Sequence, residues 1–146
     1  MNHRSCGACH YLFGHIIALV LAAALLLSSS PGALASPEKD PVLGDWNVKY
    51  GAPATVTMTL EGDVYTETAK TPVRVTGSSC DLPSGTVIAK FKSTGAGTYA
   101  GQHGLWSTRD CSFASWTDTT FNLSSDGTTL TAKLGQGYET TTFTKT

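Results

Sequence analysis

The strongest constraint on the fold of this chain is an alternation of apolar and polar side chains. Within 54–60, the apolar residues are Ala54, Val56, Met58 and Leu60, and a threonine separates each from the next. Successive side chains of a β-strand point to opposite faces, so this segment predicts a strand with one buried face and one wetted threonine face. The same period continues from residue 43 to the end of the chain, and it predicts no amphipathic helix after residue 40.

The pattern predicts roughly eight or nine short strands joined mostly by tight turns. Turn-forming sequences such as Glu61-Gly62-Asp63 separate neighbouring strands as they do in hairpins. Closure of a sheet removes its exposed edges, so we expect an all-β fold in which residues 43–146 form one small up-and-down antiparallel barrel of about eight strands. A two-sheet β-sandwich is the alternative. The expected strands begin at Gly44 and then cover 54–60, 64–70, 73–76, 86–92, 98–106, 111–123, 128–134 and 138–145, with a loop at 77–85.

The first 35 residues have the features of a cleavable export signal. Arg4 precedes an apolar block at 16–27, and Ala33-Leu34-Ala35 forms an A-x-A cleavage site. As a helix this block would be about 18 Å long, too short for a hydrocarbon core about 30 Å thick. We therefore expect a signal peptide at 1–35, a flexible lead-in at 36–42, and a secreted or periplasmic product with no membrane span after processing.

Cleavage after Ala35 would remove Cys6 and Cys9 and leave Cys80 and Cys111. Two cysteines in an exported chain most simply pair with each other. A disulfide that closes a loop of about 30 residues contributes about 3–4 kcal/mol of stability in the chain-entropy model. Two free buried thiols are the alternative.

Charge and side-chain chemistry exclude several classes of function. Of the ten Lys and Arg residues only Arg4 lies in the signal, so nine remain against eleven Asp and Glu, without clustering, which argues against nucleic acid as a partner. His103 is the one histidine after residue 35, and both remaining cysteines are expected to be oxidised. We therefore expect no catalytic residues, no metal site and no cofactor.

The first and the last strand of the expected barrel carry recognisable residues. Gly44-Asp45-Trp46 begins the first predicted strand, and Phe143-Thr144-Lys145 ends the last one. A G-x-W with a basic residue late in the final strand resembles the signature of the calycin β-barrels, which include lipocalins, fatty-acid-binding proteins, avidins and bacterial metalloprotease inhibitors. The resemblance implies that Trp46 closes one end of a barrel and that Lys145 packs over its ring in a cation–π contact.

Candidate ligand-binding residues are aromatic side chains and the histidine. If Tyr99 points inward, the strand period also sends His103 inward, where both could line a cavity. The alternatives for His103 are a satisfied core histidine and a residue at the barrel mouth that is exposed to water. Trp106 lies on the opposite register, and Trp116 shares a face with polar residues, so either could stack on a sugar or contact a partner. Trp46 is a ligand-binding candidate as well as a structural one.

Together these features lead us to expect an exported, non-catalytic binding protein. Its partner would be a small apolar or amphipathic ligand in a barrel cavity, or an extracellular macromolecule at the rim. One alternative is a protease inhibitor that acts through the arm at 36–42, as the resemblance to the inhibitor branch of the calycins implies. Another is a carbohydrate- or surface-binding module that uses Trp106 or Trp116.

Overall fold

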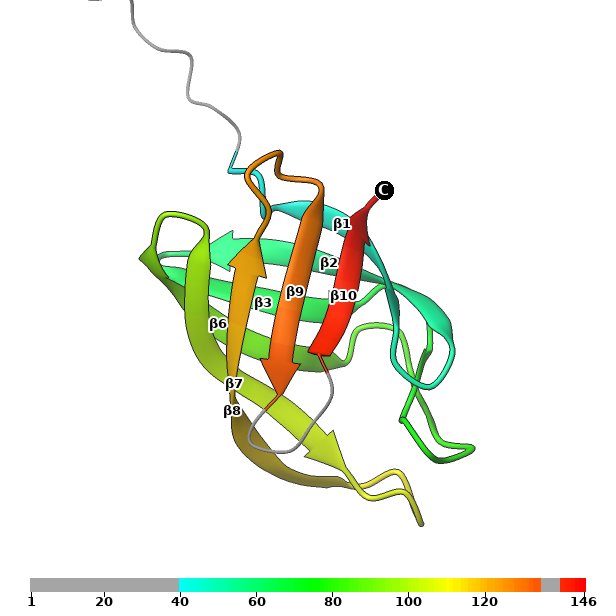
Figure 1. Ribbon diagram of the computed structural model, residues 1–146. Helices are drawn as coiled ribbons and strands as arrows, with labels where there is room; N and C mark the ends of the chain where they lie inside the picture. The colour runs from blue at the N-terminus through cyan, green and yellow to red at the C-terminus, as the bar shows by residue number, and fades with distance from the viewer. Residues whose placement is uncertain (1–39, 135–139) are drawn as a thin grey trace, which may run out of the picture. The chain divides into compact units, whose positions relative to one another are not determined.

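The computed structural model describes residues 40–134 and 140–146, and in these residues all regular structure is β-strand (Figure 1). Eight strands form a closed antiparallel barrel in the order β1-β10-β9-β8-β7-β6-β3-β2. Two further strands, β4 and β5, pair with each other outside the barrel. The strands are β1 (Gly44–Lys49), β2 (Pro53–Glu61), β3 (Val64–Ala69), β4 (Val73–Arg74), β5 (Asp81–Leu82), β6 (Val87–Gly95), β7 (Thr98–Trp106), β8 (Phe113–Leu123), β9 (Thr129–Leu134) and β10 (Thr140–Lys145).

The predicted up-and-down barrel is confirmed, and the prediction differs from the structure mainly between β3 and β6. The strand expected at 73–76 is shortened to β4, which pairs with β5 inside the segment 77–85 that we expected to be a loop. The chain reverses after Val75, whose amide donates to Cys80 O at 2.9 Å, and Gly77 takes a φ of 75° in this turn. Because Gly77 adopts this left-handed φ, the chain turns back here instead of continuing as a strand.

Two segments lie outside the described residues. They are 1–39, which includes the expected signal peptide and the lead-in residues 36–39, and 135–139, which includes the start of the last expected strand. Among the residues that the structure does describe, no helix has the length and hydropathy needed to cross a membrane.

Trp46 closes one end of the barrel. Its side chain is fully buried, and its indole Nε1 donates to Val42 O at 2.8 Å. Lys145 lies directly opposite Trp46 in the β1–β10 ladder, and its Nζ is 4.4 Å from the Trp46 ring centroid. The same ammonium donates to Pro41 O and to Leu43 O, each at 2.6 Å. One cation thus holds the tryptophan and the chain segment that leads into β1.

The residues just before β1 cover this closed end. Tyr65 Oη donates to Asp40 Oδ2 at 2.5 Å, and the amide of Val42 donates to Asp40 Oδ1 at 3.0 Å. Val42 is fully buried. The last three residues of the expected lead-in at 36–42 are therefore packed against the barrel.

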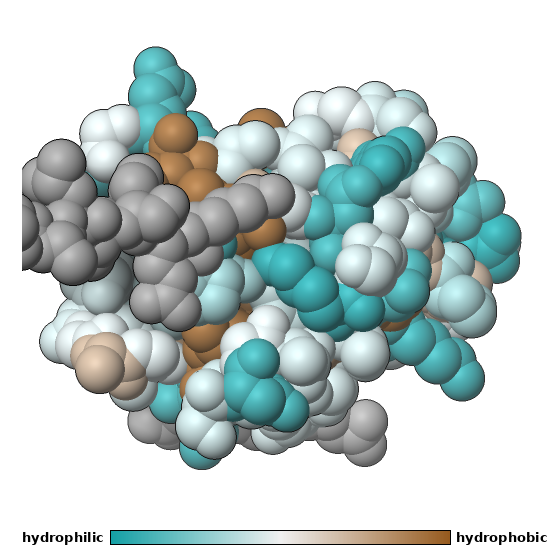
Figure 2. All heavy atoms as spheres, turned by 90° about the horizontal axis from the view of Figure 1, so that it is seen from above, coloured by the Kyte–Doolittle hydropathy of each residue, from teal (hydrophilic) through white to brown (hydrophobic). Residues whose placement is uncertain are grey.

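An aromatic core fills the barrel next to Trp46. Ring centroids lie 5.3 Å apart for Tyr65 and Phe91, 4.3 Å for Phe91 and Phe121, and 6.2 Å for Phe121 and Phe143. Such tilted and stacked pairs stabilise beyond the area that they bury. Figure 2, which views the molecule from above Figure 1, shows mostly hydrophilic and neutral residues with small hydrophobic areas between them. The aromatic rings named above are among the buried residues of the core.

Replacement of Lys145 should loosen the closed end. Lys145→Met keeps the length of the side chain but removes the cation over Trp46 and the donor to Pro41 O and Leu43 O. We expect the free energy of unfolding to fall by about 1–3 kcal/mol, as measured by urea denaturation. Lys90→Met, at an exposed position of β6, is the control and should change stability by less than about 0.5 kcal/mol. Equal effects of the two substitutions would contradict the assigned role of Lys145.

Candidate ligand pocket

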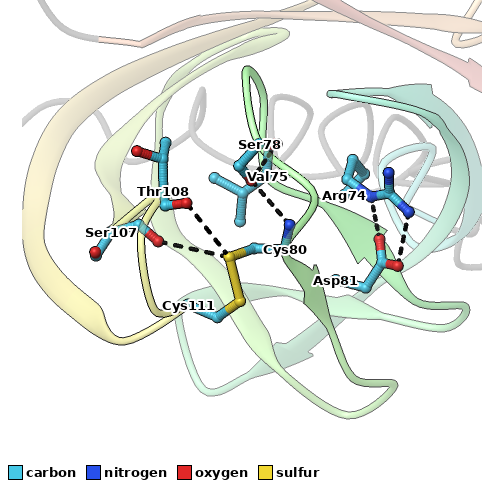
Figure 3. Close-up of polar contacts among 8 residues, drawn as sticks. All are labelled: Arg74, Val75, Ser78, Cys80, Asp81, Ser107, Thr108 and Cys111. Carbon is cyan, nitrogen blue, oxygen red and sulfur yellow. Dashed lines mark hydrogen bonds and ion pairs between the residues drawn. A yellow bond between two sulfur atoms is a disulfide. The ribbon is translucent and has the colours of Figure 1, made fainter.

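The opposite end of the barrel is crossed by residues 73–82, which we call the strap. The strap contains β4 and β5 and leaves the barrel between β3 and β6. On one side the amide of Gly51, in the β1–β2 turn, donates to Arg74 O at 3.0 Å. On the other side the predicted disulfide is confirmed, because Cys80 is bonded to Cys111 in the β7–β8 loop (Figure 3). Between the β1–β2 turn and the β7–β8 loop lie β10 and β9 in one direction around the barrel, and β3 and β6 in the other. The two attachments are therefore on opposite sides, and the strap spans the mouth of the barrel.

The strap is held in shape by its own polar contacts. Arg74 binds Asp81 with two parallel hydrogen bonds, Nε to Oδ1 at 2.5 Å and Nη2 to Oδ2 at 2.8 Å (Figure 3). Its attachment to the β1–β2 turn requires glycine, since a Cβ at Gly51 would lie 2.6 Å from Arg74 Cγ and 3.0 Å from Val75 O. The strap therefore places the charge of Arg74 at the barrel mouth, and this charge is already paired with Asp81.

A pocket of about 340 Å³ lies between the strap and the barrel end. This volume is at the lower end of the range of about 300–1,000 Å³ found for small-molecule sites. The register shift between β3 and β6 makes Ile88 an extra residue opposite β3, and Ile88 is buried against the pocket. The apolar wall is formed by Val73, Val75, Leu82, Ile88, Leu105 and Leu134, and the polar side chains at the pocket include Tyr50 and His103.

His103 is buried in this pocket without a hydrogen-bond partner. Its side chain is 6 % exposed, and neither Nδ1 nor Nε2 makes a hydrogen bond of good geometry, although the backbone of Gly104 lies close enough to oppose slightly the fall in its pKa. Its ring centroid lies 5.6 Å from that of Tyr50 and 6.2 Å from that of Trp106. Burial lowers the pKa of His103 to about 4. At neutral pH the ring is therefore uncharged, and it offers one N–H donor and one nitrogen acceptor.

Behind Tyr50 lies a fully buried carboxyl group, that of Glu67. Tyr50 Oη donates to Glu67 Oε1 at 2.7 Å, whereas Oε2 has no partner. Burial raises the pKa of Glu67 to about 8, against the smaller opposing effect of the Tyr50 hydrogen bond. Burial and the neighbouring Glu67 also raise the pKa of Tyr50 well above its usual value. The pair is therefore predominantly uncharged at neutral pH.

The strand ladders place Glu67 and His103 on one row. Glu67 pairs with Ala89, and Ala89 pairs with His103, so the three residues share the inner face of β3, β6 and β7. Since neighbouring strands are about 4.8 Å apart, the two polar residues are separated by about 10 Å across the methyl group of Ala89. This row, with three buried polar atoms that lack partners, forms the polar part of the interior.

The predicted site residues are distributed over three places. His103 and Trp106 line the pocket, and the Trp106 ring lies against Gly104, where a Cβ would be 2.4 Å from it. Trp46 and Tyr99 are buried in the core of the opposite half. Trp116 is 39 % exposed and lies outside the pocket.

Trp116 belongs to an aromatic pair on an extension of the barrel wall. Its ring centroid lies 5.3 Å from that of Phe113, which is 50 % exposed. In the described ladders, residues 113–118 of β8 pair with β7 only, because the pairing of β8 with β9 begins at Thr119. The two rings therefore form a flat apolar surface that does not enclose a pocket.

Sequence reasoning missed Tyr50 and Glu67. A signal was present, because the alternation that buries Tyr65 and Ala69 places Glu67 on the same inner face. Tyr50 likewise continues the inward series of Trp46 and Val48 after β1. A carboxyl group on an otherwise apolar strand face indicates either a buried pair or a site.

The described ranges contain no group of three His, Cys, Asp or Glu side chains that could hold a metal ion. No protein-family model matches the chain, and neither a curated protein nor a solved structure matches it. The function therefore has to be argued from the chain's own residues.

An unpartnered buried histidine lowers stability, and its removal should show this. We expect His103→Leu to raise the free energy of unfolding at pH 7 by about 1–2 kcal/mol, because it removes two unsatisfied polar atoms from an apolar wall. The matched control is Thr119→Val, since Thr119 is equally buried but donates to Lys133 O at 3.1 Å. That substitution should lower stability by about 0.5–1.5 kcal/mol. Destabilisation by both, in urea denaturation, would mean that His103 is satisfied in solution.

Glu67 should make stability depend on pH. In the unfolded chain its carboxyl group loses a proton near pH 4.5, whereas the folded protein keeps it up to about pH 8. The unfolded state therefore binds fewer protons between these values, and the free energy of unfolding falls as pH rises. Relative to Glu67→Gln, the wild type should lose about 4 kcal/mol between pH 4.5 and 8. Denaturation of both proteins across this range measures the difference, and a constant difference would show that Glu67 titrates normally.

Proposed function

We propose that this protein is an exported, non-catalytic binding protein that holds a compact, mostly apolar small molecule in the pocket between strap and barrel. The observation that carries the proposal is His103, whose two ring nitrogens lack partners inside an apolar pocket. A buried polar group without a partner costs about 1–3 kcal/mol, and a leucine would fill the same wall without that cost. A ligand that supplies the missing hydrogen bonds gives the histidine a function.

The distribution of packing in the barrel supports the same proposal. Aromatic rings fill the half next to Trp46, whereas the half below the strap keeps a pocket of about 340 Å³. Concave, mostly apolar pockets of this size that are partly open to solvent are typical of small-molecule sites.

We further propose that the chain is a member of the calycin-like barrels. Support comes from the closed antiparallel barrel of eight strands and from Lys145 Nζ, which lies over the Trp46 ring. Export is supported by the Cys80–Cys111 disulfide, because such bonds persist in oxidising compartments.

Two alternatives have less support. Inhibition through 36–42 needs a free arm, but Val42 and Asp40 are anchored in the closed end of the barrel. A carbohydrate- or surface-binding module could use the Phe113–Trp116 pair, which offers stacking area on an exposed face but no enclosed pocket. We therefore favour the pocket.

Naphthalene tests the proposal as a compact apolar ligand that carries no head group. We expect it to shift the NMR signals of pocket residues such as Ile88 and Trp106 in a saturable way. Leu105→Trp, which places a larger side chain at the pocket, should lower the affinity at least about tenfold. Leu60→Trp, at an exposed position of β2, is the control and should leave the affinity unchanged. Shifts that do not saturate, or that survive Leu105→Trp, would refute binding in this pocket.

A further inference from the structure

We propose that the pocket selects an uncharged ligand whose compact apolar body carries a hydroxyl group, and that this hydroxyl binds between His103 and Tyr50. The inference rests on the proposed function and adds to it the chemistry of the ligand's head group.

The hydrogen-bonding groups of the pocket match a group that both donates and accepts. The uncharged imidazole of His103 offers one N–H and one lone pair, and neither is used. Tyr50 Oη donates to Glu67 Oε1 at 2.7 Å, and in this arrangement its oxygen keeps a lone pair that can accept from a ligand. A ligand hydroxyl can accept from the His103 N–H and donate to the Tyr50 oxygen. A carboxylate can only accept, and an ammonium can only donate.

The charges around the pocket exclude an ionic head group. Among the described residues that line it, Arg74 is the one side chain with a permanent charge, and two hydrogen bonds hold it to Asp81. Glu67 is fully buried behind Tyr50 and does not line the pocket. A carboxylate or ammonium bound beside His103 would therefore lose its hydration without gaining a counter-ion.

The size of the pocket restricts the apolar body. The volume of about 340 Å³ and the strap that spans the barrel mouth leave room for one or two fused rings. The class of ligand is therefore a ring alcohol or phenol, and not an ionised fatty acid or amine.

Four compounds with the same ring system test the head group. They are naphthalene, 2-naphthol, 2-naphthoate and 2-naphthylmethylammonium, each titrated at pH 7 by isothermal calorimetry and protein NMR. We expect 2-naphthol to bind at least about tenfold more tightly than each of the other three. Tighter binding of either ionic compound, or equal affinity of naphthalene and 2-naphthol, would overturn the inference and leave the proposed function standing. Failure of all four to bind would overturn both.

Variants test whether His103 and Tyr50 cause the preference for a hydroxyl group. The ratio of the 2-naphthol and naphthalene affinities should fall from at least about ten to near one in His103→Leu. Thr119→Val, whose side chain faces the interior but does not line the pocket, should keep the wild-type ratio. If His103→Leu does not fold, Tyr50→Phe supplies the second test, because it removes the acceptor oxygen and should also lower the ratio. A wild-type ratio in either folded variant would show that the hydroxyl binds elsewhere.

Discussion

The pairing of β1 with β10 is the interaction on which the rest of this structure depends. It joins the first and last strands of the barrel, places Trp46 opposite Lys145, and turns an open sheet of eight strands into a closed one. Closure removes the exposed strand edges and defines an inside and an outside for every alternating side chain. Lys145 then adds the bonds to Pro41 O and Leu43 O that fix the chain before β1 over the closed end.

The interior made by this closure has two unlike halves. One is packed with aromatic rings around Phe91 and Phe121, and the other contains the pocket and the row formed by Glu67, Ala89 and His103. The packed half contains the largest fully buried side chains, those of Trp46, Phe91, Phe121 and Phe143, and large buried side chains contribute most per residue to stability. The hollow half contains polar atoms that reduce stability, which is typical of a site kept for binding.

Much of the fold could be predicted from sequence because alternation is a local property. The pattern at 54–60 is enough to predict a half-buried strand, and the predicted pairing of Cys80 with Cys111 needs only a count of the cysteines that follow the expected signal peptide. The strap could not be predicted, because strands of two residues show no period and its position depends on contacts between distant residues such as Gly51 and Arg74. For the same reason the strap side of the pocket could not be predicted, since five of the thirteen lining residues belong to the strap, although His103 and Trp106 were among the predicted candidates.

The single cross-link of the described chain lies at the end of the barrel where packing is sparsest. The strap is joined to the barrel wall at its base, where the amide of Gly85 donates to Ala69 O at 2.8 Å, and near its tip by the bond from Cys80 to Cys111. In the oxidised protein the strap is attached both at its base and near its tip. In the reduced protein the base of the strap and the hydrogen bond from Gly51 N to Arg74 O would remain, and the part near Cys80 would lose its covalent attachment. The disulfide is therefore the covalent restraint on the side of the pocket farthest from Trp46, and reduction would remove it without touching any contact of Trp46.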